Sequence, residues 1–314
     1  MNALPIQAAH ALPACPEERR WLIEGLWADQ AVGIVGGEPK CCKSFLALDM
    51  AVAVASGAAC LRRFQVPQPG RVLLFAAEDA LHVVRERLEG ICAAARTPLA
   101  TLDVQVITAP SVRLDLEADR RLLAEAVVRL APKLLVLDPF VRLHRIDENV
   151  SGEVAPLLAF LRELQRAHAL AVAVVHHAKK GASRARAGQA LRGSSEFHAW
   201  GDSNLYLRRC GESLALSIEH RAAPSRNGIP LALVKNGPAL ALEVVEAPRP
   251  PEPTPTSAVE RIENALALSA APVALAALRD TCRMRTQSVS AALGALVQQG
   301  RVAKTTDGYA LAHP

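Results

Sequence analysis

The segment between residues 35 and 44 constrains the fold of this chain more than any other. It has the sequence Val-Gly-Gly-Glu-Pro-Lys-Cys-Cys-Lys-Ser, after an apolar run at 31–35 and before an apolar stretch at 45–55. A strand, a turn and a helix joined in this way, with Lys-Ser at the join, are typical of a phosphate-binding loop. Backbone N–H groups surround the phosphates, the lysine contacts the β- and γ-phosphates, and the hydroxyl ligates Mg²⁺. We therefore predict a nucleoside triphosphate and Mg²⁺ site formed by Gly37, Glu38, Pro39, Lys40, Cys41, Cys42, Lys43 and Ser44.

One position of this loop departs from the usual pattern. Cys42 stands where the second glycine of a phosphate-binding loop is expected. If the backbone is left-handed at residue 42, a cysteine there costs ~1–2 kcal/mol. The alternative is that residue 42 needs no positive φ and that its thiol points away from the nucleotide. The departure bears on turnover more than on nucleotide binding.

Length and composition favour an intracellular α/β protein. The chain has 314 residues and a formal charge of +5, and 51% of its residues are apolar. No uninterrupted apolar run reaches the ~18–20 residues that cross a bilayer, and the N-terminus lacks a signal pattern. We therefore expect a cytoplasmic protein with no membrane partner. The seven cysteines are scattered without a C-x-x-C pair, so neither a zinc site nor a disulfide framework is indicated.

Short apolar runs alternate with amphipathic stretches over the first half of the chain. Strands are expected at 31–35, 72–77, 104–107, 134–137 and 171–175, with helices at 44–56, 80–95, 117–131 and 153–168. Repeated β-α units predict an α/β fold with a mostly parallel sheet covered on both faces. After residue 202, closely spaced strands predict antiparallel hairpins that extend the sheet edge, at 204–208, 213–220, 230–235 and 239–245.

Proline residues mark a domain boundary. Residues 248–256 have the sequence Pro-Arg-Pro-Pro-Glu-Pro-Thr-Pro-Thr, which cannot form a helix or a central strand. Such a segment is typical of an extended, semi-rigid linker. The sequence thus predicts an ATPase-like α/β domain at 1–247, a linker at 248–256 and a small second domain at 257–314.

Two carboxylates follow apolar runs that should be neighbouring strands. Asp138 ends Leu-Leu-Val-Leu-Asp, at the edge where open α/β sheets bind ligands, and is expected to hold Mg²⁺ through water. Glu78 follows the run that begins at Val72 and is placed to polarise an attacking water. Either acid could instead be a residue that stabilises a helix N-terminus.

Five motifs in order resemble one family. They are the loop ending in Lys43-Ser44, the strand end Ala77-Glu78-Asp79, Leu135-Val-Leu-Asp-Pro139, the pair His176-His177 before Lys179-Lys180, and Leu191-Arg-Gly-Ser-Ser195. Over residues 17–245 the chain resembles the RecA-fold ATPases of the plasmid RepA type, hexameric replicative helicases and their relatives on mobile elements. The resemblance implies ATP and Mg²⁺ as cofactors, with Glu78 as the catalytic glutamate and Asp138 as the metal-binding aspartate. It also implies that His176 or His177 senses the γ-phosphate.

The resemblance implies a homo-oligomer, most simply a hexamer, with sites between subunits. A neighbour's arginine then completes the charge clamp on the transferring phosphoryl group. Arg208 and Arg221 are the candidates, because each follows an edge strand, and the family pattern of a basic pair at a strand end favours Arg221, after His220. A solvated hairpin arginine is the alternative for each.

A basic segment between residues 178 and 192 contains no acidic residue and many small ones. It is expected to be a loop that contacts nucleic-acid phosphates, although a solvated loop is the alternative. It lacks interleaved aromatic residues, so base stacking is not indicated. The candidate DNA contacts are Lys179, Lys180, Arg184, Arg186 and Arg192.

The last 58 residues predict three helices followed by a hairpin, an order that resembles a winged helix-turn-helix domain. Thr286 is expected to cap the third helix, which stops at Gly300. In such a domain the third helix enters the DNA major groove. The base contacts would be Arg285, Thr286, Gln287 and Ser290, with Arg283 and Lys304 on phosphates. A protein-interaction domain is the alternative.

Two functions remain consistent with the sequence. One is an ATP-driven ring motor that acts on DNA, with other replication or mobile-element proteins, in replication or mobilisation of a plasmid or integrated element. The other is a nucleotide-switched DNA-binding regulator or assembly factor with little or no ATP turnover. Cys42 and the predicted winged helix favour the second, and Glu78 with the paired histidines favours the first.

Overall fold

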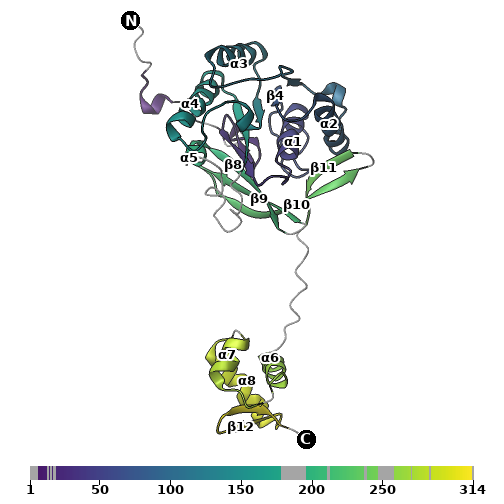
Figure 1. Cartoon of the computed structure of the whole chain (residues 1–314), viewed down its shortest axis with the longest axis vertical. Helices are drawn as coiled ribbons and strands as arrows, with labels where there is room; N and C mark the ends of the chain where they lie inside the picture. The colour runs from purple at the N-terminus through teal and green to yellow at the C-terminus, as the bar shows by residue number, and fades with distance from the viewer. Residues whose placement is uncertain are drawn as a thin grey trace. The chain divides into compact units, whose positions relative to one another are not determined.

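The chain forms two compact units, Met1–Glu246 and Ala247–Pro314, which we describe separately (Figure 1). The computed structural model describes residues 6–12, 14, 16, 19–177, 196–210, 213–236, 239–246, 258–269, 271–282 and 284–312. The predicted linker at 248–256 and the predicted basic loop, with Lys179, Lys180, Arg184, Arg186 and Arg192, therefore lie outside the described residues.

A nine-stranded sheet forms the centre of the first unit within the described residues, in the order β11-β10-β9-β8-β3-β7-β6-β4-β5. Strands β8, β3, β7, β6, β4 and β5 pair in parallel, whereas β8 to β11 pair as antiparallel neighbours. The strands are β3 Val32–Gly37, β4 Val72–Ala76, β5 Val104–Val106, β6 Leu134–Asp138, β7 Ala171–His177, β8 Ser203–Cys210, β9 Ser213–His220, β10 Arg226–Asn236 and β11 Ala239–Val244.

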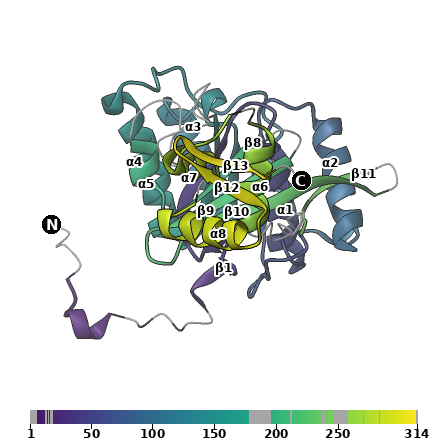
Figure 2. The ribbon, with the colours of Figure 1, turned by 90° about the horizontal axis from the view of Figure 1, so that it is seen from below.

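Helices cover both faces of this sheet. One hydrophobic core lies between the sheet and α1 and α2, and a second lies between the sheet and α3, α4 and α5. Figures 1 and 2 show these two groups of helices on opposite sides of the strands. The helices are α1 Lys43–Ser56, α2 Leu81–Ala95, α3 Glu117–Leu130, α4 Ser151–His168 and α5 Glu196–Trp200, with short 3-10 turns at Ala9–Ala11, Leu99–Thr101 and Phe140–Arg142.

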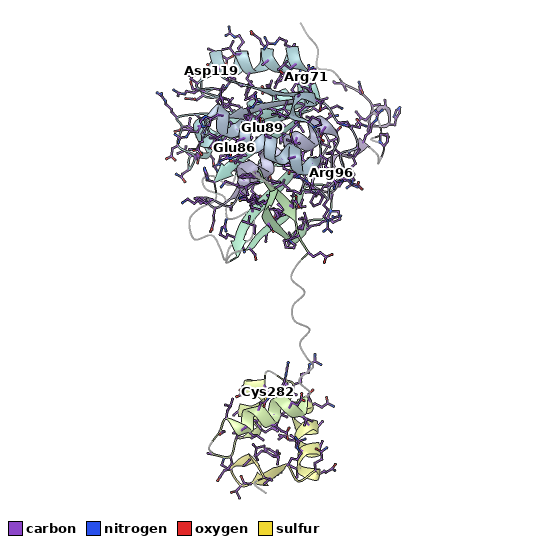
Figure 3. All side chains as sticks on the ribbon, turned by 90° about the vertical axis from the view of Figure 1, so that its right-hand side faces the viewer. Arg71, Glu86, Glu89, Arg96, Asp119 and Cys282 are labelled. Atoms are coloured by element: carbon purple, nitrogen blue, oxygen red, sulfur yellow. The ribbon has the colours of Figure 1, made fainter. Side chains whose placement is uncertain are left out.

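The residues of the central strands explain why both faces must be covered. All five residues of β6 are buried, and the first six residues of β7 are buried as well. Continuous apolar runs of this kind suit parallel strands that have helices on each side. By contrast, α2 has one solvent face, on which Glu86 and Glu89 are exposed (Figure 3). The predicted mostly parallel, doubly covered α/β sheet is therefore confirmed.

Two features of the first unit differ from the sequence-based expectation. β8 belongs to the predicted hairpin region, yet it pairs in parallel with β3, with Leu207 opposite Gly37. The sheet thus changes from parallel to antiparallel at β8. A short hairpin of β1 Trp21–Ile23 and β2 Trp27–Ala28 was also not predicted. Trp27 is fully buried, so this hairpin belongs to the core.

The second unit contains three helices and a hairpin around its own small core. The helices are α6 Ala258–Ala267, α7 Leu275–Cys282 and α8 Thr286–Gln298, and the strands are β12 Val302–Thr305 and β13 Gly308–Leu311. An isolated bridge joins Val273 to Tyr309, which adds a third segment to the hairpin. The predicted cap at Thr286 is wrong: α8 begins at Thr286, and the cap position is Arg285, without a side-chain hydrogen bond.

Candidate nucleotide-binding site

The end of β3 places the predicted phosphate-binding loop against β8. Gly37 has φ 155°, and a Cβ atom there would lie 2.4 Å from the carbonyl oxygen of Leu207 and 2.6 Å from the Sγ of Cys41. Real Cβ atoms do not approach other atoms so closely, so a side chain at residue 37 would force the loop away from β8. Glycine at this position is therefore required by packing as well as by backbone conformation.

The loop contains two left-handed residues that are not glycine. Lys40 has φ 63°, and Cys42 has φ 64° and ψ 26°. The alternative that residue 42 needs no positive φ is thus wrong. Each such residue costs ~1–2 kcal/mol, since the left-handed conformation brings Cβ close to the following carbonyl oxygen. The loop therefore has a backbone conformation that glycine adopts easily, and Lys40 and Cys42 adopt it with strain.

Lys43 occupies the centre of the loop. Its ammonium group is buried and donates a hydrogen bond to the carbonyl oxygen of Glu38, with an Nζ–O distance of 2.8 Å. The same Nζ lies 3.9 Å from the Sγ of Cys41. A cation that is enclosed by backbone at the start of a helix is suited to phosphate oxygens, because the helix N-terminus adds a favourable field.

Ser44 and Asp138 meet across the base of the loop. The side chain of Asp138, at the end of β6, is nearly buried and is hydrogen-bonded to that of Ser44. Burial raises the pKa of Asp138 to about 6; the Ser44 hydrogen bond and Lys43 oppose this shift, whereas Asp79 and Glu78 add to it. A hydroxyl and a carboxylate are hard oxygen ligands of the kind that Mg²⁺ prefers. These residues fit a magnesium ion.

Glu78 lies beside Asp138, just beyond the end of β4. Its carboxylate is half exposed and forms an ion pair with Arg142, with an Nε–Oε1 distance of 3.1 Å. The next residue, Asp79, forms an ion pair with Arg87 of α2. The two acids therefore pair with different arginines, Glu78 with Arg142 and Asp79 with Arg87.

His176 and His177 diverge at the end of β7. The ring of His176 is buried and stacks on Phe197 with a centroid distance of 4.2 Å. His177 lines the cavity at the phosphate-binding loop. Of the two predicted sensors, the structure brings His177 to the candidate site and places His176 in the core beneath α5.

The cavity at the loop has a volume of about 300 Å³ and is lined by most of the residues predicted for the nucleotide site. It also includes Phe45 and Arg87, which sequence reasoning missed. Arg87 lies over the ring of Phe45, with its guanidinium carbon 5.2 Å from the ring centroid. The lining residues are Lys40, Cys41, Cys42, Lys43, Ser44, Phe45, Glu78, Asp79, Arg87, Asp138, Val175 and His177.

Comparison with known proteins identifies a family for the part of the chain that contains this cavity. A family model described as an AAA domain matches residues 2–183, which include the phosphate-binding loop, Glu78, Asp138 and His177. The chain belongs to the AAA-domain family. The matched region ends before β8, so the antiparallel part of the sheet lies beyond it.

The AAA domain of this chain has a RecA-like P-loop fold. A solved structure of a DnaB-like replicative helicase, described together with its interactions with primase, is similar with a TM-score of 0.52 at 14% identity. The match covers 67% of this chain and 56% of that chain, so the present sequence corresponds to little more than half of the helicase. Among the helices that the structure describes, none combines the length and apolar content needed to span a bilayer.

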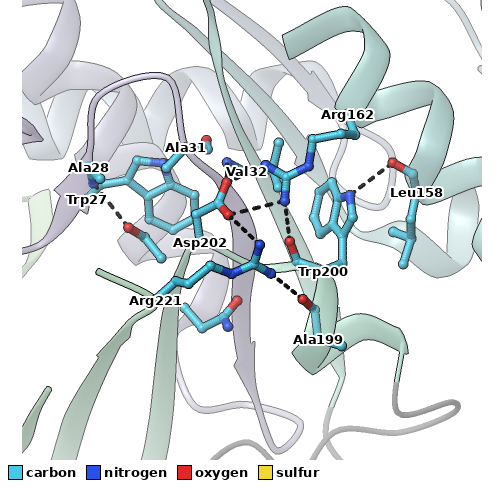
Figure 4. Close-up of polar contacts among 12 residues, drawn as sticks. Trp27, Ala28, Ala31, Val32, Leu158, Arg162, Ala199, Trp200, Asp202 and Arg221 are labelled. Atoms are coloured by element: carbon cyan, nitrogen blue, oxygen red, sulfur yellow. Dashed lines mark hydrogen bonds and ion pairs between the residues drawn. The ribbon is translucent and has the colours of Figure 1, made fainter. Parts of the chain in front are cut away.

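Arg221, which follows β9, has a partner within the first unit, contrary to the sequence-based expectation. Its guanidinium lies 3.4 Å from the carboxylate of Asp202 and also donates to the carbonyl oxygen of Ala199 (Figure 4). The same carboxylate pairs with Arg162 of α4 and accepts a hydrogen bond from the Val32 backbone N–H. Asp202 thereby joins α4 and β3 to Arg221, which in turn contacts α5 through the carbonyl oxygen of Ala199.

The predicted DNA contacts of the second unit are exposed. Arg285 and Lys304 are exposed, and the first turn of α8 presents uncharged polar side chains beside Arg285. Arg283 lies outside the described residues. The exposed candidates are Arg285, Thr286, Gln287, Ser290 and Lys304.

Proposed function

We propose that this AAA-domain protein binds and hydrolyses ATP as a RepA-like ring protein that acts on DNA in replication or mobilisation of a plasmid or integrated element. The observation that carries the proposal is the meeting of Lys43, Ser44, Asp138 and Glu78 around one cavity at the carboxyl edge of the sheet. Open α/β sheets bind their ligands at this edge.

Each of these residues has a distinct role in the proposed reaction. Lys43 binds the β- and γ-phosphates, and Ser44 with Asp138 would hold Mg²⁺, which neutralises charge on the phosphates when it is bound. Glu78 accepts a proton of the attacking water as the water oxygen bonds to the γ-phosphorus, and the bond from that phosphorus to the β,γ-bridging oxygen breaks to release ADP. Arg142 pairs with the carboxylate of Glu78, which lines the cavity.

Subunit assembly is the second part of the proposal. A hexamer would place Arg208 or Arg221 of one subunit at the site of the next, and the similarity of the fold to a DnaB-like replicative helicase supports this arrangement. The second unit is proposed to be a winged helix-turn-helix domain that binds DNA through α8, with β12 and β13 as its wing.

A second candidate function follows from the left-handed backbone at Cys42. Strain in the phosphate-binding loop favours slow turnover, as expected of a nucleotide-switched DNA-binding regulator or assembly factor. In that case ATP would drive assembly, and hydrolysis would be slow or absent.

ATP hydrolysis measured alone, with single-stranded DNA and with double-stranded DNA tests the two functions. A motor that tracks along a strand should be strongly stimulated by single-stranded DNA. Tight ATP binding with little hydrolysis under all three conditions would support the switch. Absence of ATP binding would contradict both.

A further inference from the structure

Two consecutive arginines near the end of β8 lie on opposite faces of the sheet. Leu205 and Leu207 belong to the core beneath α1, whereas Tyr206 belongs to the core beneath α4 and α5. Side chains alternate along a strand, so Arg209 shares the face of Leu207 and Arg208 shares that of Tyr206. Since the phosphate-binding loop leads into α1, Arg209 is on the nucleotide side of the sheet.

Arg209 contacts the loop directly. Its Nη2 donates a hydrogen bond to the carbonyl oxygen of Lys40, at a distance of 3.1 Å. The charge of Arg209 also affects Cys42. Burial raises the pKa of the Cys42 thiol, and three nearby cations oppose this rise. Arg209 has the largest opposing effect, followed by Lys43 and Arg87. The Arg209 side chain is exposed to solvent, and its guanidinium has further N–H donors for an anion bound at the loop.

The cationic and anionic side chains that line the cavity are equal in number, so a further cation would favour phosphate binding. Three cationic residues line the cavity, namely Lys40, Lys43 and Arg87, against the carboxylates of Glu78, Asp79 and Asp138. Arg87 is already paired with Asp79. A nucleoside triphosphate with one Mg²⁺ keeps a net negative charge, and a balanced lining gives it no net attraction. One more guanidinium at the loop makes the site attractive to phosphates.

We propose that Arg209 binds the phosphates of the nucleotide held by its own subunit, as a cation supplied in cis. The inference rests on the proposed function, because it assigns a further ligand of the same ATP. Through Lys40, Arg209 also supports the left-handed apex of the loop. It differs in this from Arg208 and Arg221, which are proposed to act on a neighbouring subunit.

The test measures the affinity of the full-length protein for Mg²⁺-ATP in the variants Arg209→Ala and Arg209→Lys. Inorganic tripolyphosphate serves as a competitor, because it contains the phosphates without the nucleoside. We expect Arg209→Ala to weaken both affinities at least about 10-fold, the loss of one charge-assisted hydrogen bond. Arg209→Lys should restore most of the affinity. The control is Arg226→Ala, which removes an exposed arginine of β10 and should change neither affinity.

Several results would overturn the inference. Equal affinities of wild type and Arg209→Ala would overturn the inference and leave the ATP-binding proposal intact. A wild type that binds ATP no better than Lys43→Ala would instead contradict the proposed function itself. A lowered unfolding temperature of unliganded Arg209→Ala, with no rescue by lysine, would reduce Arg209 to a structural role. If Arg209→Ala does not fold, Arg209→Gln replaces it as the neutral variant.

Mixed oligomers separate the cis role from a trans role. Subunits with Arg209→Ala are mixed with subunits carrying Lys43→Ala, and ATP hydrolysis is measured. If Arg209 acts in cis, each site with an intact Lys43 lacks Arg209, and activity does not recover. Recovery of activity would show that Arg209 serves a neighbouring site and would overturn the inference.

Discussion

His176 and His177 are adjacent in β7, yet the first stacks on Phe197 in the core and the second lines the cavity at the phosphate-binding loop. Alternation along a strand explains the difference, because consecutive side chains point to opposite faces of the sheet. Phe197 belongs to α5, which begins at Glu196, four residues beyond the end of the predicted basic loop at Arg192. The strand end thus links the nucleotide cavity on one face to α5 on the other.

Substitution of the two histidines should therefore affect different properties of the protein. We expect His176→Ala to lower the free energy of unfolding by ~2–4 kcal/mol, because it leaves a cavity next to Phe197. His177→Ala should change stability little but should reduce ATP hydrolysis or its stimulation by DNA. Thermal unfolding and a steady-state ATPase assay distinguish the two. Equal losses of stability would contradict the assignment of the two faces.

Substitutions of Lys43 and Glu78 should separate ATP binding from ATP hydrolysis. Lys43→Ala removes the cation that is enclosed by the loop, so we expect it to abolish tight ATP binding while leaving the fold intact. Glu78→Gln keeps the shape of the side chain and loses only the base, so binding should persist and hydrolysis should stop. A nucleotide titration and an ATPase assay measure these effects. Persistent hydrolysis by Glu78→Gln would move the base to another residue.

The backbone strain at Cys42 can be separated from its thiol. Cys42→Gly removes both, whereas Cys42→Ala removes the thiol and keeps the left-handed strain. We expect the glycine variant to be about 1 kcal/mol more stable than the alanine variant and to hydrolyse ATP faster. Chemical denaturation and ATPase assays under reducing conditions give the comparison. If the two variants behave alike, backbone strain at residue 42 does not limit turnover.

His220 should make stability depend on pH. Burial lowers its pKa below 6.5; the Gly25 carbonyl opposes the shift, and Arg20 and Arg226 add to it. The unfolded chain therefore binds a proton near pH 6.5 that the folded chain accepts only at lower pH. Between these two pKa values stability rises with pH. His220→Gln should reduce the pH dependence of the urea unfolding midpoint between about pH 5 and pH 7.5. An unchanged slope would assign the dependence to other groups.

Local sequence was enough to predict the centre of the site. Asp138 and Glu78 each follow an apolar run, and parallel strands bring their carboxyl ends to one edge, so their meeting with Lys43 required no knowledge of strand order. The same reasoning located the alternating strands and helices, since both depend on hydrophobic periodicity over short windows.

Long-range pairing was not predictable in this way. Arg209 reaches Lys40 because β8 pairs in parallel with β3, although the two strands are separated by more than 160 residues. The pairing of Arg221 with Asp202 also depends on long-range contacts, because Asp202 is held by Val32 of β3 and Arg162 of α4. A run of hydrophobic residues indicates a strand without indicating its neighbour, so contacts of this kind follow only from the folded sheet.

The two signature glycine positions of the loop tolerate change differently, and this bears on how such proteins are detected. A Cβ at Gly37 would collide with Leu207 of the neighbouring strand, whereas at Cys42 a side chain is held at a cost of ~1–2 kcal/mol. A search that requires both glycines would overlook this chain. A search that fixes the glycine beside the sheet and leaves the second position open would recover it and any protein with the same substitution.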